Sequence, residues 1–179
     1  MAGQETPRIY VASLSDYNAG TLHGAWLDAT GADAVNDGIA AMLRASPEGN
    51  AEEFAIHDYE GFGSYRVHEY ESIETVCAVA EAIAEHGTLF ADYLAHVGEA
   101  KDADGVADAL ERFRESYQGS FDSLENWAEQ FLDDTGALKE VPESLRGYID
   151  FEAWARDAEL NGDVFTLETD GTTHVFWGT

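Results

Sequence analysis

The sequence predicts an α+β protein that is elongated and consists of three small domains in a row. Three observations predict this arrangement. Alternating, β-rich patterns occur near both ends of the chain, apolar residues at helical spacing fill its middle, and the pattern changes near Phe62 and near Arg112. The expected domains are an α+β domain over 1–62, a helical domain over 63–112 and an α+β domain over 113–179.

The first segment is predicted to form a three-stranded sheet with one helix. Runs rich in β-branched and aromatic residues are expected to form the strands, namely RIYVASL (8–14), TLHGAWLDA (21–29) and EEFAIHDYE (52–60). A helix over 33–45 is predicted by apolar residues at helical spacing, which are Val35, Ile39, Met42 and Leu43.

The middle segment is predicted to contain three helices. We expect Ser72, Thr88 and Asp104 to cap their N-termini, and Gly87 and Gly98 to end the first two. The residues expected to face inward are Ile73, Val76, Cys77, Ala80 and Ile83 in the first helix, Leu89, Phe90, Tyr93, Leu94 and Val97 in the second, and Val106, Ala107, Leu110 and Phe113 in the third.

The last segment is predicted to combine a small sheet with two helices. We expect a short strand at 116–121, a helix from Ser123 to Gly136 and a helix capped by Asp150 that ends at Gly162. The run VFTLETDGTTHVFW predicts a β-hairpin, because Asp-Gly between two β-rich runs favours a two-residue turn. The inward residues expected are Leu124, Trp127, Ala128, Phe131 and Leu132 in the first helix, and Phe151, Trp154, Ala155 and Ala158 in the second.

Negative charge dominates the composition. The 179 residues include 36 acidic and 9 basic ones, which gives a formal net charge of −27, and the three segments carry −8, −8 and −11. Such a chain repels nucleic acid and anionic membranes and attracts basic surfaces. Three domains that all carry this charge also repel one another, which favours an extended arrangement.

The chain has the features of a cytoplasmic protein. Its single cysteine, Cys77, excludes an internal disulfide and favours a reducing compartment. The N-terminus lacks the basic and apolar regions of a signal peptide, and no apolar run approaches the roughly 20 residues of a membrane span. We therefore expect a soluble, cytoplasmic protein that binds neither membrane nor nucleic acid.

The predicted helices place carboxylates in stripes. Residues three, four or seven positions apart share a helix face, and carboxylates one turn apart repel each other by about a few tenths of a kcal/mol. The stripes are Glu74, Glu81 and Glu85; Asp108, Glu111 and Glu115; and Glu125, Glu129 and Asp133. A solvated helix face explains any one stripe, and general adaptation to high salt is an alternative explanation for all three.

The sequence offers no convincing catalytic constellation. In DFEAWARDAEL (150–160), Arg156 lies between Glu152 and Glu159 on one helix face, which favours ionised carboxylates rather than a general acid. Asp150 is interpreted as an N-cap and Asp157 as solvent-facing.

A metal-dependent hydrolase is an alternative, because His57-Asp58 and His68-Glu69 lie near Cys77 in the sequence. However, no H-x-x-x-H, HExxH or paired cysteines are present. His57 is better explained as a packed or hydrogen-bonded side chain. We therefore expect no catalytic residue, no cofactor and no bound metal.

Four long, aromatic-rich segments resemble the ArdA family of antirestriction proteins, and the resemblance extends along nearly the whole chain. They are IYVASLSDYNAGTLHGAWLD (9–28), EEFAIHDYEGF (52–62), SYQGSFDSLENWAEQFLDDTG (116–136) and YIDFEAWARDAELNGDVFTL (148–167). The resemblance implies a non-enzymatic protein, encoded on mobile elements, that mimics B-form DNA. Its implied partner is the DNA-binding groove of a Type I restriction-modification enzyme, especially the methyltransferase core.

The resemblance also implies an elongated three-domain monomer that forms a homodimer through its third domain, with the family's antirestriction motif in the region matching 145–160. An alternative is an acidic inhibitor of another DNA-binding protein.

The aromatic residues of 113–179 exceed what a small sheet can bury, and Phe176 and Trp177 are expected to be exposed. A dimer with twice the −27 charge matches the phosphates of about 27 base pairs.

The candidate phosphate analogues are acidic residues along the matched length of the chain. They are Asp58, Glu60, Glu74, Glu81, Glu85, Asp108, Glu111, Glu115, Asp122, Glu125, Glu129, Asp133, Asp134, Asp150, Glu152, Asp157 and Glu159.

Overall fold

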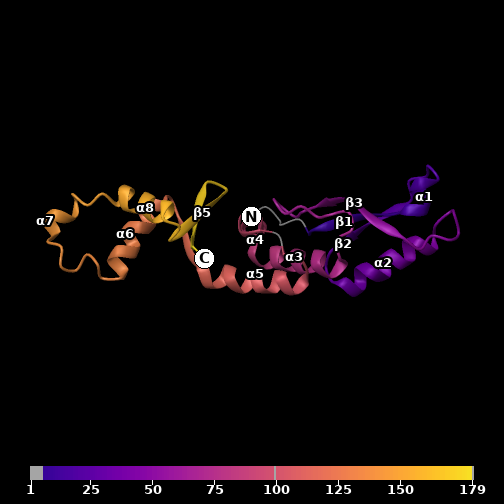
Figure 1. Cartoon of the computed structure of the whole chain (residues 1–179), viewed down its shortest axis with the longest axis horizontal. Helices are drawn as coiled ribbons and strands as arrows, with labels where there is room; N and C mark the ends of the chain where they lie inside the picture. Colours follow the sequence, from indigo (N-terminus) through magenta and orange to yellow (C-terminus); the bar gives the residue numbers. More distant parts are fainter. Residues whose placement is uncertain (1–5, 99, 179) are drawn as a thin grey trace. The chain divides into compact units, whose positions relative to one another are not determined.

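The computed structural model describes residues 6–98 and 100–178 and confirms the α+β class (Figure 1). These residues form two three-stranded sheets and eight helices. The chain divides into two compact units, a first unit that ends at Glu111 and a second unit that begins at Arg112. The three-domain division remains a prediction.

The first unit contains one antiparallel sheet of strand order β2-β1-β3. In Figure 1, α2 and α3 lie below this sheet. The elements, of which α5 continues into the second unit, are β1 (Arg8–Ser13), α1 (Leu14–Asn18), β2 (Gly24–Asp28), α2 (Ala32–Arg44), β3 (Phe54–Glu60), α3 (Ile73–His86), α4 (Thr88–Val97) and α5 (Ala103–Ser116).

One face of the sheet forms the core with α2. Ile9 and Val11 of β1 are fully buried, and Val35 of α2 is almost completely so. Gly38 lets α2 approach β2 closely, because a Cβ atom there would lie 2.7 Å from Cδ2 of Leu27. The helix predicted over 33–45 is thus confirmed, with its apolar stripe on the sheet.

Two predicted helix caps are wrong. Gly87, with φ of 75° and ψ of −175°, ends α3 and directly precedes α4, so Thr88 is the first residue of that helix. Helix α5 begins one residue before Asp104, and the Asp102 carboxylate accepts the Gly105 backbone N–H at 2.9 Å. The cap at Ser72 is confirmed, since its hydroxyl accepts the Thr75 N–H at 3.1 Å.

Two predicted core residues of the first unit are exposed. Val97, at the last position of α4, is 38% exposed. Ala107 is exposed, whereas Ala109 is buried beside Val106 in α5. Small apolar residues on a charged helix leave its inward face ambiguous by about one position, which explains the error at Ala107.

Helix α1 is not predicted from the sequence, and it carries a buried carboxylate. Asp16 is fully buried and accepts a hydrogen bond of 2.6 Å from the Ser46 hydroxyl, which lies just after α2. Burial alone raises the pKa of Asp16, but hydrogen bonds from Ser13, Ser46 and the Glu48 backbone outweigh it and lower the pKa. The ionised carboxylate therefore joins α1 to the end of α2.

We expect Asp16 to stabilise the first unit in a pH-dependent way. Its folded pKa lies below the ordinary 3.8, so its stabilising effect is present above that value and is lost as the pH falls through the folded pKa. Asp16→Asn should therefore lower the urea midpoint at pH 7. The difference in urea midpoint between the variant and the wild type should narrow below pH 3.8. A gap that widens on acidification would contradict this assignment.

The second unit contains an antiparallel sheet of strand order β4-β6-β5. The predicted hairpin is confirmed, and its turn residues Asp170 and Gly171 have positive φ values of 53° and 77°, as such a turn requires. The elements are β4 (Tyr117–Phe121), α6 (Leu124–Asp134), α7 (Glu143–Arg146), α8 (Phe151–Leu160), β5 (Val164–Thr169) and β6 (Thr172–Trp177). Of these, α7 is not predicted.

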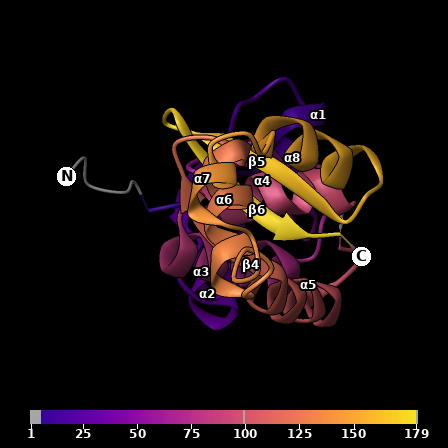
Figure 2. The same ribbon diagram turned by 90° about the vertical axis from the view of Figure 1, so that its left-hand side faces the viewer.

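Both faces of this sheet are packed. Helices α6 and α8 contact each other and the strands β5 and β6 (Figure 2). Trp127 is the centre of the cluster between them, and its ring contacts those of Phe131, Trp154 and Trp177. Across the sheet, the fully buried Phe176 is stacked on Phe165, in the paired position of β5.

The expected exposure of Phe176 and Trp177 is therefore wrong. Phe176 is fully buried, and its ring also contacts Phe113 and Tyr117. Trp177 is only half-buried, against Trp127. The rings on opposite faces of β6 explain why so many aromatic residues fit one small sheet.

Candidate functional site: an exposed acidic surface

Nearly all carboxylates of the described residues lie at the surface. Of the 34 acidic residues described, 31 are exposed, Glu71 and Asp92 are half-buried, and Asp16 is buried. All 17 candidate phosphate analogues are among the exposed ones. The structure thus makes them accessible to a partner.

Burial of the apolar helix faces holds the stripes at the surface. In α3, Val76 and Ile83 are almost completely buried, while Glu74, Glu81 and Glu85 are exposed. All five residues predicted to face inward in this helix are buried.

Helix α6 repeats this arrangement. Trp127 and Ala128 are buried, while Glu125, Glu129 and Asp133 are exposed. The stripe of Asp108, Glu111 and Glu115 on α5 is likewise exposed. Packing of the apolar face into the core leaves each carboxylate stripe at the surface. The stripes therefore face solvent without a bound partner.

Basic side chains of the same chain lie beside several candidates: an arginine beside Glu60 and beside Asp133, and His86 beside Glu85, with Nε2 3.4 Å from Oε1. Arg8 donates to Glu60 through Nη2 at 2.6 Å and through Nε at 2.8 Å. Arg146 lies with Nη1 3.7 Å from Oδ1 of Asp133. The first is a close charge-assisted pair and the second a loose one, so Glu60 is the weaker phosphate analogue of the two.

The segment DFEAWARDAEL forms α8, and Asp150 caps it as predicted. Its Oδ1 accepts the Ala153 N–H at 2.8 Å. Arg156 lies in the same helix between Glu152 and Glu159, and within the described residues it forms no ion pair with either of them. Glu159 instead accepts a hydrogen bond of 2.8 Å from the Thr166 hydroxyl.

Two substitutions separate the capping role of Asp150 from its charge. Asp150→Ala removes the cap and should cost about 1 kcal/mol of stability. Asp150→Ser keeps a capping oxygen but removes the charge, so the protein should remain close to wild-type stability. Chemical denaturation of both variants measures this difference. Equal losses of stability in the two would show that the charge, and not the cap, stabilises α8.

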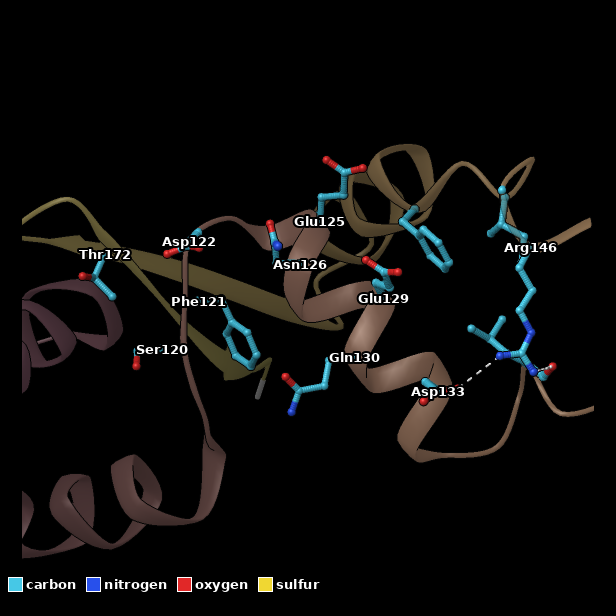
Figure 3. Close-up of a pocket in the computed structure, with 14 residues that line it drawn as sticks. Ser120, Phe121, Asp122, Glu125, Asn126, Glu129, Gln130, Asp133, Arg146 and Thr172 are labelled. Atoms are coloured by element: carbon cyan, nitrogen blue, oxygen red, sulfur yellow. Dashed lines mark hydrogen bonds and ion pairs between the residues drawn. The ribbon is translucent and has the colours of Figure 1, made fainter. Parts of the chain in front are cut away.

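A groove of about 970 Å³ lies beside α6 in the second unit, and sequence reasoning missed it (Figure 3). Glu125, Glu129 and Asp133 line it along the helix, and Arg146 lies at the far side. Arg146 also donates hydrogen bonds to the carbonyls of Leu138, at 2.9 Å, and Val141, at 3.3 Å. It thereby fixes the loop that leads into α7, a role that no sequence pattern reveals.

Two residues that suggested a hydrolase, Cys77 and His57, are packed against other parts of the fold. Cys77 is buried in α3, and burial raises the pKa of its thiol. His57 is half-buried, and its ring meets the edge of Tyr17 with the centroids 4.9 Å apart. Within 6–98 and 100–178, no three His, Cys, Asp or Glu side chains are grouped closely enough to hold a metal ion.

The same residues contain no helix long and apolar enough to cross a bilayer. The fold and its surface define an acidic α+β protein whose exposed carboxylates are hydrogen-bond acceptors suited to lysine and arginine side chains. The sequence model of the ArdA antirestriction proteins matches residues 9–172, and the chain belongs to this family. A comparison with curated proteins gives no match.

Proposed function

We propose that this antirestriction protein mimics B-form DNA and occupies the DNA-binding groove of a Type I restriction-modification enzyme. The observation that supports this proposal most is the exposure of 31 of the 34 described carboxylates on a chain of the ArdA family. Proteins that bind DNA neutralise its phosphates with lysine and arginine side chains. Exposed carboxylates can pair with the same lysine and arginine side chains.

The spacing of the carboxylates sets the scale of the mimicry. Glu125, Glu129 and Asp133 follow one another every four residues, or about 6 Å along the helix axis. A DNA strand carries one charge per about 3.4 Å of axis. A single helix therefore supplies roughly half the charge density of one strand, and the mimic needs carboxylates from several elements together.

Inhibition of methyl transfer tests this function. Purified protein is added to a Type I methyltransferase with DNA that contains its recognition site. Methylation should fall with rising protein concentration and recover when more DNA is added. A chelator should leave inhibition unchanged, because no step uses a metal. Methylation that persists at a large excess of protein would contradict the proposal.

The dimer is also a proposal, and the exposed apolar residues of the second unit support it. Tyr148 is 87% exposed, Leu160 is 77% exposed and Leu145 is 53% exposed. Exposed apolar side chains of this size suit a symmetric interface. The interface must overcome the repulsion between two chains of −27, so salt should tighten it by screening that repulsion.

Sedimentation at low and high salt measures this effect. Tyr148→Ser should weaken the dimer by about ten-fold or more, since burying a large apolar side chain contributes about 1.5–3 kcal/mol. Tyr70→Ser, which alters an exposed tyrosine of the first unit, is the matched control. A dimer that weakens as salt rises, or that responds equally to both changes, would exclude this interface.

A further inference from the structure

The sheet of the first unit has a second face that carries aromatic and charged side chains. Strand pairing places Arg8 between Asp28 and Glu60, and the next row places Tyr10 between Trp26 and Asp58. The alternate residues of β1, Ile9 and Val11, are fully buried on the α2 side. Rows of side chains two residues apart project from the same face of a strand.

The two aromatic rings on this face are held in place. The Tyr10 and Trp26 centroids lie 5.6 Å apart. Tyr10 lies over Gly24, because a Cβ atom there would come within 2.7 Å of its ring. Trp26 remains 38% exposed at the surface. The rings form a small stacking surface that the core does not cover.

The chain itself shows how this surface receives a guanidinium. The Arg8 Cζ atom lies 4.8 Å from the Trp26 ring centroid, and Arg8 is paired with Glu60 at the same time. Asp28 and Asp58, on the two strands beside β1, are exposed carboxylates. A second guanidinium that contacts the exposed part of Trp26 could therefore pair with Asp28 or Asp58.

We propose that this face of the β2-β1-β3 sheet binds arginine side chains of a basic partner protein. Trp26 and Tyr10 provide the stacking surface, and Asp28 and Asp58 pair with the charge. Arginine fits better than lysine, because its planar guanidinium both stacks on aromatic rings and bonds carboxylates with two donors. The net charge of −27 favours a basic protein over a nucleic acid, although bases also stack on aromatic rings.

This inference rests on the proposed function, since the target's DNA-binding groove would supply the arginines. It adds an aromatic contact that phosphate mimicry lacks, because a planar guanidinium also stacks on the Trp26 ring. The predicted contact is also local: it concerns four side chains of the first unit rather than the whole acidic surface.

Site-resolved titration tests the surface directly. An alternating arginine-glycine peptide and its lysine-glycine counterpart are added to the ¹⁵N-labelled full-length chain. The indole N–H signal of Trp26, assigned through Trp26→Leu, should shift more than those of Trp127, Trp154 and Trp177. The arginine peptide should cause the larger shift at equal concentration. Shifts confined to the other indoles, or equal effects of both peptides, would overturn the proposal.

Variants complete the test. Trp26→Leu keeps an apolar side chain but removes the ring, and it should weaken binding of the arginine peptide by about two- to five-fold, the effect of an exposed cation–π contact. Asp58→Asn should weaken binding of both peptides, and that of the arginine peptide at least as much as that of the lysine peptide. The controls are Tyr70→Leu and Asp37→Asn, which change an exposed ring and an exposed carboxylate elsewhere. Equal effects of the Trp26 and Tyr70 changes would exclude the site.

A parallel assay separates this inference from the proposed function. If wild-type protein inhibits a Type I methyltransferase and Trp26→Leu inhibits as strongly, the mimic stands and the arginine surface is excluded. If wild type does not inhibit, the proposed function fails while the peptide titration still decides the surface. A Trp26 signal that shifts with protein concentration, without peptide, would assign the face to a second copy of the chain and overturn the proposal.

Discussion

Replacing five striped carboxylates together is expected to weaken inhibition of a Type I methyltransferase by roughly 5-fold to 4,000-fold. The five changes to glutamine are at Glu74, Glu81, Glu85, Glu125 and Glu129, all of them exposed. Exposed ion pairs contribute about 0.2–1 kcal/mol each, so five lost pairs sum to about 1–5 kcal/mol. A dose–response curve at fixed, low salt measures the loss.

Single changes should behave very differently, because mimicry distributes binding over many contacts. Glu152→Gln or Glu159→Gln alone should keep inhibition within a few-fold of the wild type. Complete loss from one isosteric change in a folded protein would indicate a catalytic or a unique binding group instead.

A control variant with five other substitutions separates the effect of carboxylate position from the effect of net charge. It neutralises exposed carboxylates outside the candidate set, namely Glu48, Glu52, Glu53, Asp163 and Asp170. Both variants lose the same formal charge, but only the first alters the stripes. If both weaken inhibition equally, net charge alone directs binding and the stripes have no special role.

Trp127→Ala is expected to unfold or strongly loosen the second unit. Trp127 is 2% exposed, and its ring contacts three other aromatic side chains between α6, α8 and β6. Truncation of a buried tryptophan costs about 3–5 kcal/mol, which is a large part of the roughly 5–15 kcal/mol that stabilises a whole domain. Near-ultraviolet circular dichroism and urea unfolding measure the effect.

The loss should be confined to the second unit. The Trp26 indole signal, which reports on the first sheet, should stay at its wild-type position in the Trp127→Ala variant. Trp127→Phe keeps part of the volume and is expected to cost less. A Trp127→Ala protein with unchanged unfolding behaviour would show that this aromatic cluster does not form the core of the second unit.

Regular periodicity made much of the fold predictable. Helix α3 repeats its apolar residues at helical spacing between Ser72 and Gly87, and all of its predicted core residues are buried. Asp170-Gly171 likewise defines the β5–β6 hairpin, because a turn with two positive φ values requires such residues.

The errors arise where distant segments decide the outcome. Helix α1 has only five residues, too few for a periodic pattern, and it is fixed by Asp16 and Ser46, 30 positions apart. Phe176 looks exposed in a terminal strand, yet it is covered by Phe113 and Phe165. Neither contact leaves a local signal in the sequence.

The candidate site was predictable only in part. Helical geometry correctly places the stripes of α3, α5 and α6 on exposed faces, because the apolar residues opposite them form the cores. Strand register forms the Arg8–Glu60 pair and the Trp26–Tyr10 surface. Loop closure brings Arg146 to the carbonyl oxygen to which it donates. These features become visible only when the strands and loops are folded.

Competition between this protein and DNA for one Type I methyltransferase tests the account most directly. A fluorescent duplex with the recognition site is bound to the enzyme, and the protein is titrated at salt concentrations from about 50 to about 200 mM. We predict complete displacement of the duplex, with an affinity that weakens steeply as salt rises. Simultaneous binding of duplex and protein, or a binding constant indifferent to salt, would contradict DNA mimicry.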